Sequence, residues 1–203
     1  MDHVADLPRP KLAGVHHTAF ATWKPKETVE FYRDVLGLKP IHAVTAKGWG
    51  RDAHPDFIHF FFDAGQGSAI AFFYYIGTEP MAEPAGPRGY LGMARHTSWT
   101  VETQAELEDW KARLEAKGVA VSQEVQHEVV RSLYFRDPNG YPLEISLTTR
   151  VPDDRDAADT ELTLQAMIET FADGPAPETK TIEDMWRRKG ELVAASQGKA
   201  VSA

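Results

Sequence analysis

An internal repeat is the feature that most constrains the fold of this 203-residue chain. A segment beginning at His17 and another beginning at His96, 79 positions later, each predict a strand followed by a helix. Each copy then continues into three short runs that are typical of strands, and a glycine-containing turn joins the last two runs. We therefore predict an α+β fold in which two paired βαβββ units form a curved mixed sheet around a cup.

The repeat also sets the expected domain boundaries. The two units are expected to cover about residues 12–80 and 91–150, preceded by an extended N-terminal arm at 1–11. Residues 151–203 differ in composition and predict a helical tail. The helix of the second unit has clear signals, because Thr103 and Glu106 have the spacing of a capping box.

The tail predicts two helices, at residues 160–172 and 181–196, separated by the Gly-Pro-Ala-Pro sequence at 174–177. Apolar residues recur in both segments at helical spacing. We expect the tail either to pack on its own domain or to bind a second subunit. A homo-oligomer is the expected assembly.

Charge and composition narrow the possible partners. The net charge is −8 and no dense Lys/Arg cluster occurs, which disfavours nucleic acid and anionic membranes. No apolar run approaches the roughly 18 residues of a membrane span, and the N-terminus lacks a signal-peptide pattern, so a cytoplasmic location is expected. The chain contains no cysteine, so histidines and carboxylates must hold any metal.

The phase of the predicted strands brings four polar side chains to one face. Glu144 lies between two apolar residues that share the opposite, core-facing side of its strand. A carboxylate on such a strand is costly unless a positive charge meets it. The same alternation directs Tyr134, His17 and His96 toward the cup. Two imidazoles and one carboxylate on one face of a metal leave positions open for substrate and oxygen, which favours non-haem Fe(II).

At residues 125–144 the chain resembles the signature of extradiol ring-cleavage dioxygenases, within the vicinal oxygen chelate superfamily of paired βαβββ units. The matching elements are His127, the Leu133–Tyr134 pair, the Asp-Pro-Asn-Gly turn at 137–140, and Glu144. The resemblance to the superfamily covers about residues 12–149, and the tail lies outside it.

This resemblance implies a role for each matching residue. His17, His96 and Glu144 would be the iron ligands, and Tyr134 would hydrogen-bond to a catecholate oxygen. His127 would contact the substrate or move a proton. The expected reaction is Fe(II)-dependent extradiol cleavage of a catechol-type aromatic ring by O₂. Mn, Zn or Ni are alternative metals.

Two features depart from the family pattern. Larger members have four βαβββ units, whereas this chain has two. They also carry another active-site histidine, for which His42, His54 and His59 are candidates without an obvious match. His16, which points away from the face of His17, remains the alternative first ligand.

Two other functions remain open. One is a glyoxalase-like isomerase or a thiol transferase that uses Zn, Ni or Mn. Relatives with that chemistry often have a carboxylate ligand on the last strand of the first unit, and this strand has none. The other is a metal-free module of the bleomycin-resistance type that binds a flat aromatic compound. The complete set of two histidines and one glutamate disfavours it.

Overall fold

A computed structural model describes residues 12–48, 55–80, 94–171 and 180–200. It divides the chain into a body that ends at Thr149 and a tail that begins at Arg150. The elements of the body are β1 (His17–Ala21), α1 (Pro25–Glu30), a π-helical turn (Phe31–Val35), β2 (Pro40–Ala46), β3 (Phe57–Gly65), β4 (Ser68–Tyr75), β5 (Thr97–Val101), α3 (Gln104–Ala116), β6 (Val125–Gln126), β7 (Val130–Arg136) and β8 (Pro142–Thr148). The elements of the tail are α4 (Asp154–Phe171) and α5 (Ile182–Ala200).

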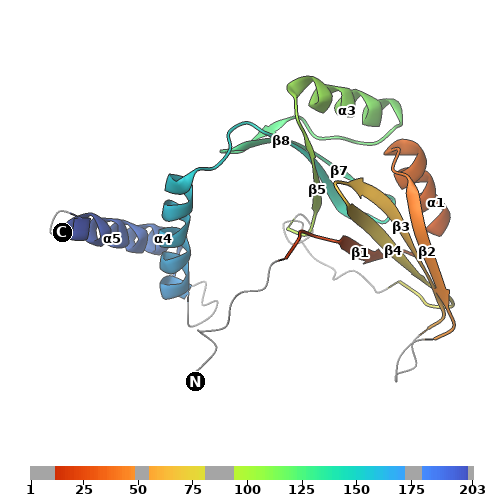
Figure 1. Cartoon of the computed structure of the whole chain (residues 1–203), viewed down its shortest axis with the longest axis horizontal. Coiled ribbons are helices and arrows are strands. Elements are labelled where there is room, and N and C mark those ends of the chain that lie inside the picture. The colour runs from red at the N-terminus through yellow and green to blue at the C-terminus, as the bar shows by residue number, and fades with distance from the viewer. Residues whose placement is uncertain (1–11, 49–54, 81–93, 172–179, 201–203) are drawn as a thin grey trace. The chain divides into compact units, whose positions relative to one another are not determined.

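The body contains two four-stranded sheets with the same topology (Figure 1). Their strand orders are β1-β4-β3-β2 and β5-β8-β7-β6. In each sheet the first strand pairs in parallel with the fourth, and the other neighbouring strands are antiparallel. The predicted α+β fold with two βαβββ units is therefore confirmed.

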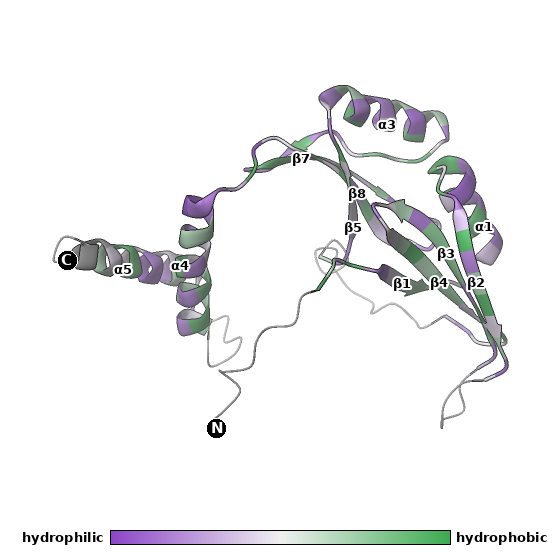
Figure 2. Ribbon diagram, in the orientation of Figure 1, coloured by the Kyte–Doolittle hydropathy of each residue, from purple (hydrophilic) through white to green (hydrophobic). Residues whose placement is uncertain are grey.

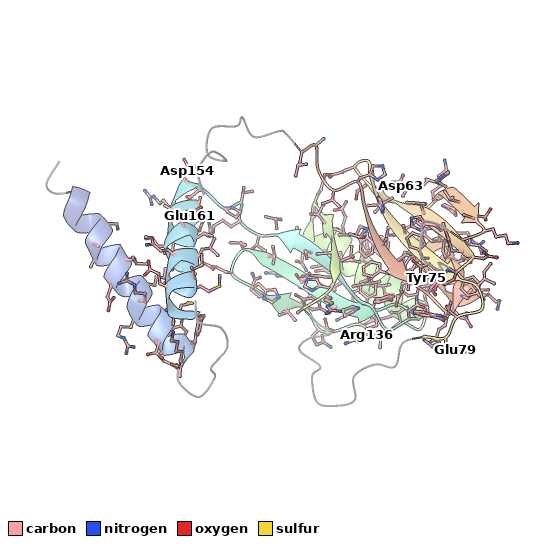
Figure 3. All side chains as sticks on the ribbon, turned by 90° about the horizontal axis from the view of Figure 1, so that it is seen from below. Asp63, Tyr75, Glu79, Arg136, Asp154 and Glu161 are labelled. Carbon is pink, nitrogen blue, oxygen red and sulfur yellow. The ribbon has the colours of Figure 1, made fainter. Side chains whose placement is uncertain are left out.

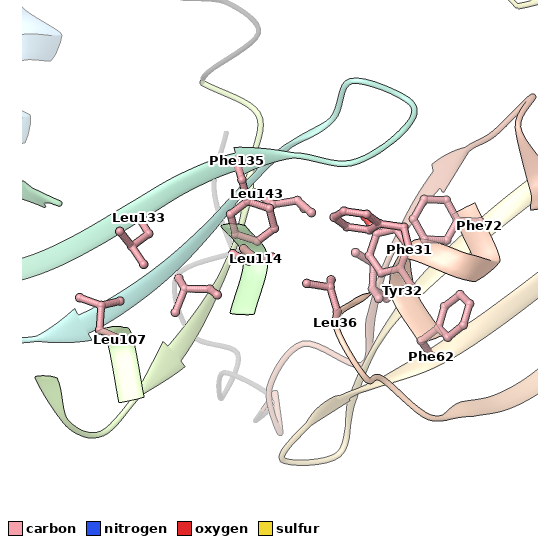
Figure 4. Close-up of a cluster of buried hydrophobic side chains, with 12 residues drawn as sticks. Phe31, Tyr32, Leu36, Phe62, Phe72, Leu107, Leu114, Leu133, Phe135 and Leu143 are labelled. Carbon is pink, nitrogen blue, oxygen red and sulfur yellow. The ribbon is translucent and has the colours of Figure 1, made fainter. Parts of the chain in front are cut away.

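One apolar core joins the two units (Figure 4). Tyr32 and Leu36 of the first unit belong to the same buried cluster as Leu107 and Leu114 of α3. The capping box predicted for α3 is present, since the Thr103 hydroxyl accepts a hydrogen bond from the Glu106 amide and the Glu106 carboxylate accepts one from the Thr103 amide. These bonds satisfy amides at the start of α3, and burial of its leucines holds the helix on its sheet.

The turn between β7 and β8 also connects the units. The Tyr141 hydroxyl donates to the Ala21 carbonyl at 2.9 Å, and Thr22 donates to the Asn139 side chain at 2.7 Å. Asp137, only 5% exposed, accepts a hydrogen bond from the Tyr32 hydroxyl at 3.3 Å. A turn that the sequence marks only as a reversal of the chain therefore also docks the second unit on the first.

Three elements differ from the expected boundaries, and one of them is α5, which ends at Ala200 rather than at residue 196. The run at 119–125 predicts a full strand, but only Val125–Gln126 forms a ladder. The Ser122 hydroxyl accepts the hydrogen bond of the Tyr134 amide, so a side chain replaces a backbone partner there. Helix α4 begins at Asp154, earlier than predicted, because the Asp153 carboxylate accepts hydrogen bonds from the amides of Arg155 and Asp156.

The tail helices pack against each other and carry many exposed side chains (Figure 3). Hydrophobic and hydrophilic residues alternate along both of them (Figure 2). Among the described residues, no helix combines the length and apolar composition that a membrane crossing needs.

Candidate metal centre

The second sheet gathers four of the five predicted site residues. On β8, Glu144 lies opposite Tyr134 of β7 and opposite Ser98 of β5. His96 immediately precedes β5 and lies two residues before Ser98, so it shares their face of the sheet. His127 follows β6, and its amide donates to the Val130 carbonyl at 2.8 Å, which folds the chain back toward β7.

Glu144 and His96 are in direct contact. The Nε2 atom of His96 lies 2.9 Å from the Oε2 atom of Glu144. Glu144 is 5% exposed, whereas about a third of the His96 side chain (34%) is exposed. Burial raises the pKa of Glu144, but hydrogen bonds from Ser132, Tyr134 and Ser146, together with His96, outweigh it and hold that pKa below its usual value. The site therefore favours an ionised carboxylate beside an imidazole nitrogen, which is the donor chemistry of an Fe(II) site.

Tyr134 connects Glu144 to His127. The Tyr134 hydroxyl lies 2.8 Å from Nε2 of His127. Burial raises the pKa of Tyr134, and its hydrogen bond to Glu144 raises it further. The hydroxyl is therefore protonated at neutral pH and can donate a hydrogen bond to an oxygen atom on this face.

Two serine hydroxyls hydrogen-bond to the Glu144 carboxylate, and a third, that of Ser98, hydrogen-bonds to one of them. The interpretation of the sequence assigned no role to these serines. Ser146 lies 2.7 Å from Ser98 and 3.1 Å from Ser132, oxygen to oxygen. Ser132 and Ser146 both hydrogen-bond to Glu144. Strand alternation could have found them, because each lies two positions from a predicted site residue on the same face.

His17 lies on the first sheet, in a different environment from the other site residues. Its Nδ1 atom is 2.8 Å from Nδ1 of His16, and its ring lies 5.4 Å from the Phe61 ring and 6.2 Å from the His59 ring, centroid to centroid. Over the described ranges, no three His, Asp or Glu side chains lie close enough to hold one metal ion. The structure thus brings His96 and Glu144 together without gathering His17 beside them.

The pairing register identifies which residues of the first sheet occupy the positions equivalent to those of Glu144 and Tyr134 in the second sheet. Ala19, two residues after His17, pairs with Ala71, and Ala71 pairs with Phe61. In the second sheet, Ser98 lies two residues after His96 and pairs with Glu144, which in turn pairs with Tyr134. Ala71 therefore occupies the position equivalent to Glu144, and Phe61 occupies the position equivalent to Tyr134. The first unit therefore has no carboxylate at the equivalent place.

Two of the candidate additional histidines lie on the face of the first sheet that carries His17. His42 pairs with Phe61, and His59 lies two residues from Phe61 on β3. The His59 ring stacks on Phe73 at 3.6 Å, and its Nδ1 atom lies 3.1 Å from the Phe72 carbonyl oxygen. Burial lowers the pKa of His59, and nearby His17 and His42 lower it further. His54 lies outside the described residues.

Comparison with solved structures supports the fold. A protein from Bacillus subtilis, provisionally described as a dioxygenase, is 27% identical with a TM-score of 0.50, and the match covers 66% of this chain and 40% of that one. A fosfomycin resistance protein from Listeria monocytogenes is 18% identical with a TM-score of 0.50, over 68% of this chain and 96% of that one. The second likeness concerns the fold alone.

Sequence comparison identifies the family. Biphenyl-2,3-diol 1,2-dioxygenase 2 from Rhodococcus globerulus is 36% identical over 72 residues, which is 36% of this chain and 37% of that enzyme. The match thus spans little more than a third of that relative. The model of the Glyoxalase/Bleomycin resistance protein/Dioxygenase superfamily matches residues 14–145, which is most of the body. The chain therefore belongs to the Glyoxalase/Bleomycin resistance protein/Dioxygenase superfamily.

Proposed function

We propose that the protein is an Fe(II)-dependent extradiol dioxygenase that cleaves the ring of a catechol-type aromatic compound with O₂. The observation that carries this proposal is the cluster on the second sheet, where His96, Glu144, Tyr134 and His127 lie in one connected group. The similarity to a biphenyl-diol dioxygenase over part of the chain supports the same reaction class.

His96 and Glu144 would provide two of the metal ligands, and His17 would provide the third. The donors fit Fe(II), because one ionised carboxylate already lies beside one imidazole nitrogen. When bound, the metal would supply open positions at which a diol and O₂ can be held together. His17 must approach the other two ligands to complete the set, since the described part of the chain holds no preformed group of three.

Tyr134 and His127 would then orient the substrate and handle its proton. The protonated Tyr134 hydroxyl can donate to one diol oxygen, while Glu144 beside it stays ionised. The same hydroxyl lies within hydrogen-bond distance of His127, so Tyr134 can give its own proton to the imidazole and take the diol proton in its place. The hydroxyl then donates its hydrogen bond to the deprotonated diol oxygen. This relay needs no rearrangement of the second sheet.

Tyr134→Phe is expected to lower kcat by about 10- to 100-fold, because one hydrogen bond to a charged oxygen is lost. Iron content should stay at the wild-type level, since the tyrosine is not a ligand. Steady-state oxygen uptake and iron analysis of the same sample measure both effects. Tyr74→Phe, on β4 of the other sheet, is the matched control and should leave kcat unchanged. A Tyr134→Phe enzyme with full kcat would remove the tyrosine from the mechanism.

His17→Ala is expected to abolish stoichiometric iron binding, whereas His16→Ala should weaken it by only about 10- to 100-fold. The reason is that His16 contacts Nδ1 of His17 and so orients the ring, leaving Nε2 as the nitrogen that would bind metal. Iron titration under anaerobic conditions distinguishes the two variants. A larger loss in His16→Ala than in His17→Ala would make His16 the ligand, and equal losses would contradict the division of roles between the two histidines.

Oxygen uptake tests the proposed reaction. Protein loaded anaerobically with Fe(II) should consume one O₂ per diol and form a yellow ring-opened product with 2,3-dihydroxybiphenyl, catechol or a substituted catechol. Turnover of a non-diol substrate with zinc or nickel, but not with iron, would instead support the isomerase or transferase alternative. Chelator-resistant binding of an aromatic compound without turnover would support the metal-free module.

A further inference from the structure

Three polar side chains form a closed ring of hydrogen bonds where the β7–β8 turn meets the first unit. The Thr22 hydroxyl donates to Oδ1 of Asn139 at 2.7 Å, and Nδ2 of Asn139 donates to the Thr28 hydroxyl at 3.0 Å. The Thr22 and Thr28 oxygens lie 2.9 Å apart. Because the only hydroxyl proton of Thr22 goes to Asn139, Thr28 is the donor in this last bond. We call this closed set of bonds the Asn139 ring.

The Asn139 ring has one hydrogen-bond arrangement. Nδ2 of Asn139 donates its second proton to Oδ2 of Asp137 at 2.9 Å, and the Thr22 oxygen also accepts from the Lys24 amide at 3.0 Å. Both threonines are fully buried. Any other arrangement would leave a donor or an acceptor without its partner, and a satisfied buried network of this kind makes a structure rigid. The ring therefore adds a defined relative position to the apolar core that already joins the two units.

The Asn139 ring connects the strands that carry proposed metal ligands of different units. Thr22 directly follows β1, which begins with His17, and its amide donates to the Phe73 carbonyl of β4 at 2.8 Å. Asn139 lies in the turn that leads into β8, which carries Glu144. His17 is five residues before Thr22, and Glu144 is five residues after Asn139. The ring thus lies at the joint between the two ligand-bearing strands.

A small rotation at this joint becomes a large displacement at the metal centre. His17 lies roughly 16 Å along β1 from Thr22, at about 3.3 Å per residue. A rotation of about 5° at the ring would move a side chain at that distance by about 1.4 Å, whereas metal–ligand distances hold within about 0.2 Å. The geometry of the ring therefore determines whether His17 can complete the ligand set.

We propose that Thr22 and Asn139 are positioning residues for the metal centre. Their ring holds β1 against the β7–β8 turn and so sets the approach of His17 to the ligands of the second sheet. The inference rests on the proposed function, because it takes His17, His96 and Glu144 as the ligands. Thr22 and Asn139 act through His17 and are not themselves ligands.

Anaerobic titration of the full chain with Fe(II) tests the proposal. Thr22→Val keeps the shape of the side chain but removes its hydroxyl, and Asn139→Asp keeps an acceptor for Thr22 but loses both donated hydrogen bonds. Each variant should raise the dissociation constant for Fe(II) by about 10- to 100-fold, the usual effect of losing a residue that orients a metal ligand. Thr22→Ser retains the hydroxyl and should bind Fe(II) as the wild type does.

Thr103→Ala separates positioning from general stability. This variant removes the N-cap of α3 and so destabilises the body, but Thr103 lies outside the Asn139 ring. Urea unfolding measures the loss of stability in each variant. Thr103→Ala should keep the wild-type affinity for Fe(II). An equal loss of affinity in Thr103→Ala would assign the effect to stability and overturn the proposal.

Distances between spin labels test the joint without any metal. The chain has no cysteine, so labels attach only at the introduced sites Thr45→Cys on β2 and Glu115→Cys on α3, both of which are exposed. The distance distribution between the labels should be broader with Thr22→Val or Asn139→Asp than in the otherwise wild-type chain. Thr22→Ser and Thr103→Ala should leave the distribution unchanged.

Two further results would overturn the proposal. One is wild-type affinity for Fe(II) in folded Thr22→Val and Asn139→Asp variants. The other is an unchanged distance distribution in both, because the ring would then not hold the units. If Thr22→Val does not fold, Asn139→Asp decides, since its side chain is only partly buried. A wild-type protein that binds no Fe(II) would refute the proposed metal centre and this inference with it, whereas binding that the variants leave unchanged would refute this inference alone.

Discussion

Replacing Glu144 with alanine is expected to eliminate both iron binding and ring cleavage. Glu144 is the carboxylate among the proposed ligands, and the first sheet has Ala71 at the equivalent position, so no second carboxylate can substitute for it there. Glu144→Gln should fail in the same way, because the amide keeps the shape of the side chain but lacks its charge. Metal analysis of purified, iron-loaded protein measures the first effect and oxygen uptake the second.

Glu128→Ala is the matched control for this loss. Glu128 is an exposed carboxylate in the turn between β6 and β7, next to His127 in the chain, and it lies outside the proposed ligand set. The Glu128→Ala protein should keep its iron content and its activity near the wild-type level. If Glu144→Ala retained iron and turned over a catechol, the proposed metal centre would be wrong.

Replacing Asp137 with alanine is expected to destabilise the body by about 2–4 kcal/mol, lowering Tm by roughly 5–15 °C. The buried carboxylate accepts hydrogen bonds from the Asn139 and Tyr141 amides, from the Asn139 side chain and from the Tyr32 hydroxyl. Alanine leaves all of these donors without their acceptor at the joint between the two units. Thermal and urea unfolding followed by circular dichroism measure the loss.

Asp109→Ala on the exposed side of α3 is the control, and it should change the free energy of unfolding by less than about 0.5 kcal/mol. If Asp137→Ala were as stable as this control, the turn would not hold the units together.

The stability difference between the wild type and Asp137→Ala is also expected to depend on pH. Burial raises the pKa of Asp137 above its usual value, although hydrogen bonds from Asn139 and Tyr141 and from Tyr32 offset part of that rise. The folded state therefore binds the proton more tightly than the unfolded state. The stability difference should be largest below the pKa that Asp137 has in the unfolded state. It should shrink as the pH rises through the pKa that Asp137 has in the folded state. A difference that grows over that range would contradict this assignment.

Relations within a single sheet could be predicted from the sequence. Strand alternation alone placed Glu144 and Tyr134 on one face, and the register confirms that they are direct neighbours. The repeat likewise predicted the order of elements in both units, because a repeated pattern of turns and apolar residues specifies the same local structure twice. The position of His96 beside Glu144 follows from the same rules.

Relations between the units could not be predicted in this way. How His17 stands relative to His96 depends on how one sheet docks on the other. Docking rests on particular contacts such as Tyr141 with Ala21 and Tyr32 with Asp137, which no periodicity reports. Patterns of apolar residues also do not predict where a side chain accepts a backbone hydrogen bond, as the Ser122 hydroxyl does for the Tyr134 amide.

The most direct test of the proposed function follows isotopically heavy O₂ into the product. Iron-loaded protein and 2,3-dihydroxybiphenyl, or whichever diol of the panel gives uptake, react under the labelled gas, and mass spectrometry analyses the ring-opened compound. The proposal predicts that both atoms of one O₂ molecule appear in each product molecule. Turnover of the diol without incorporated label, or no turnover of any diol by protein that demonstrably holds iron, would contradict it.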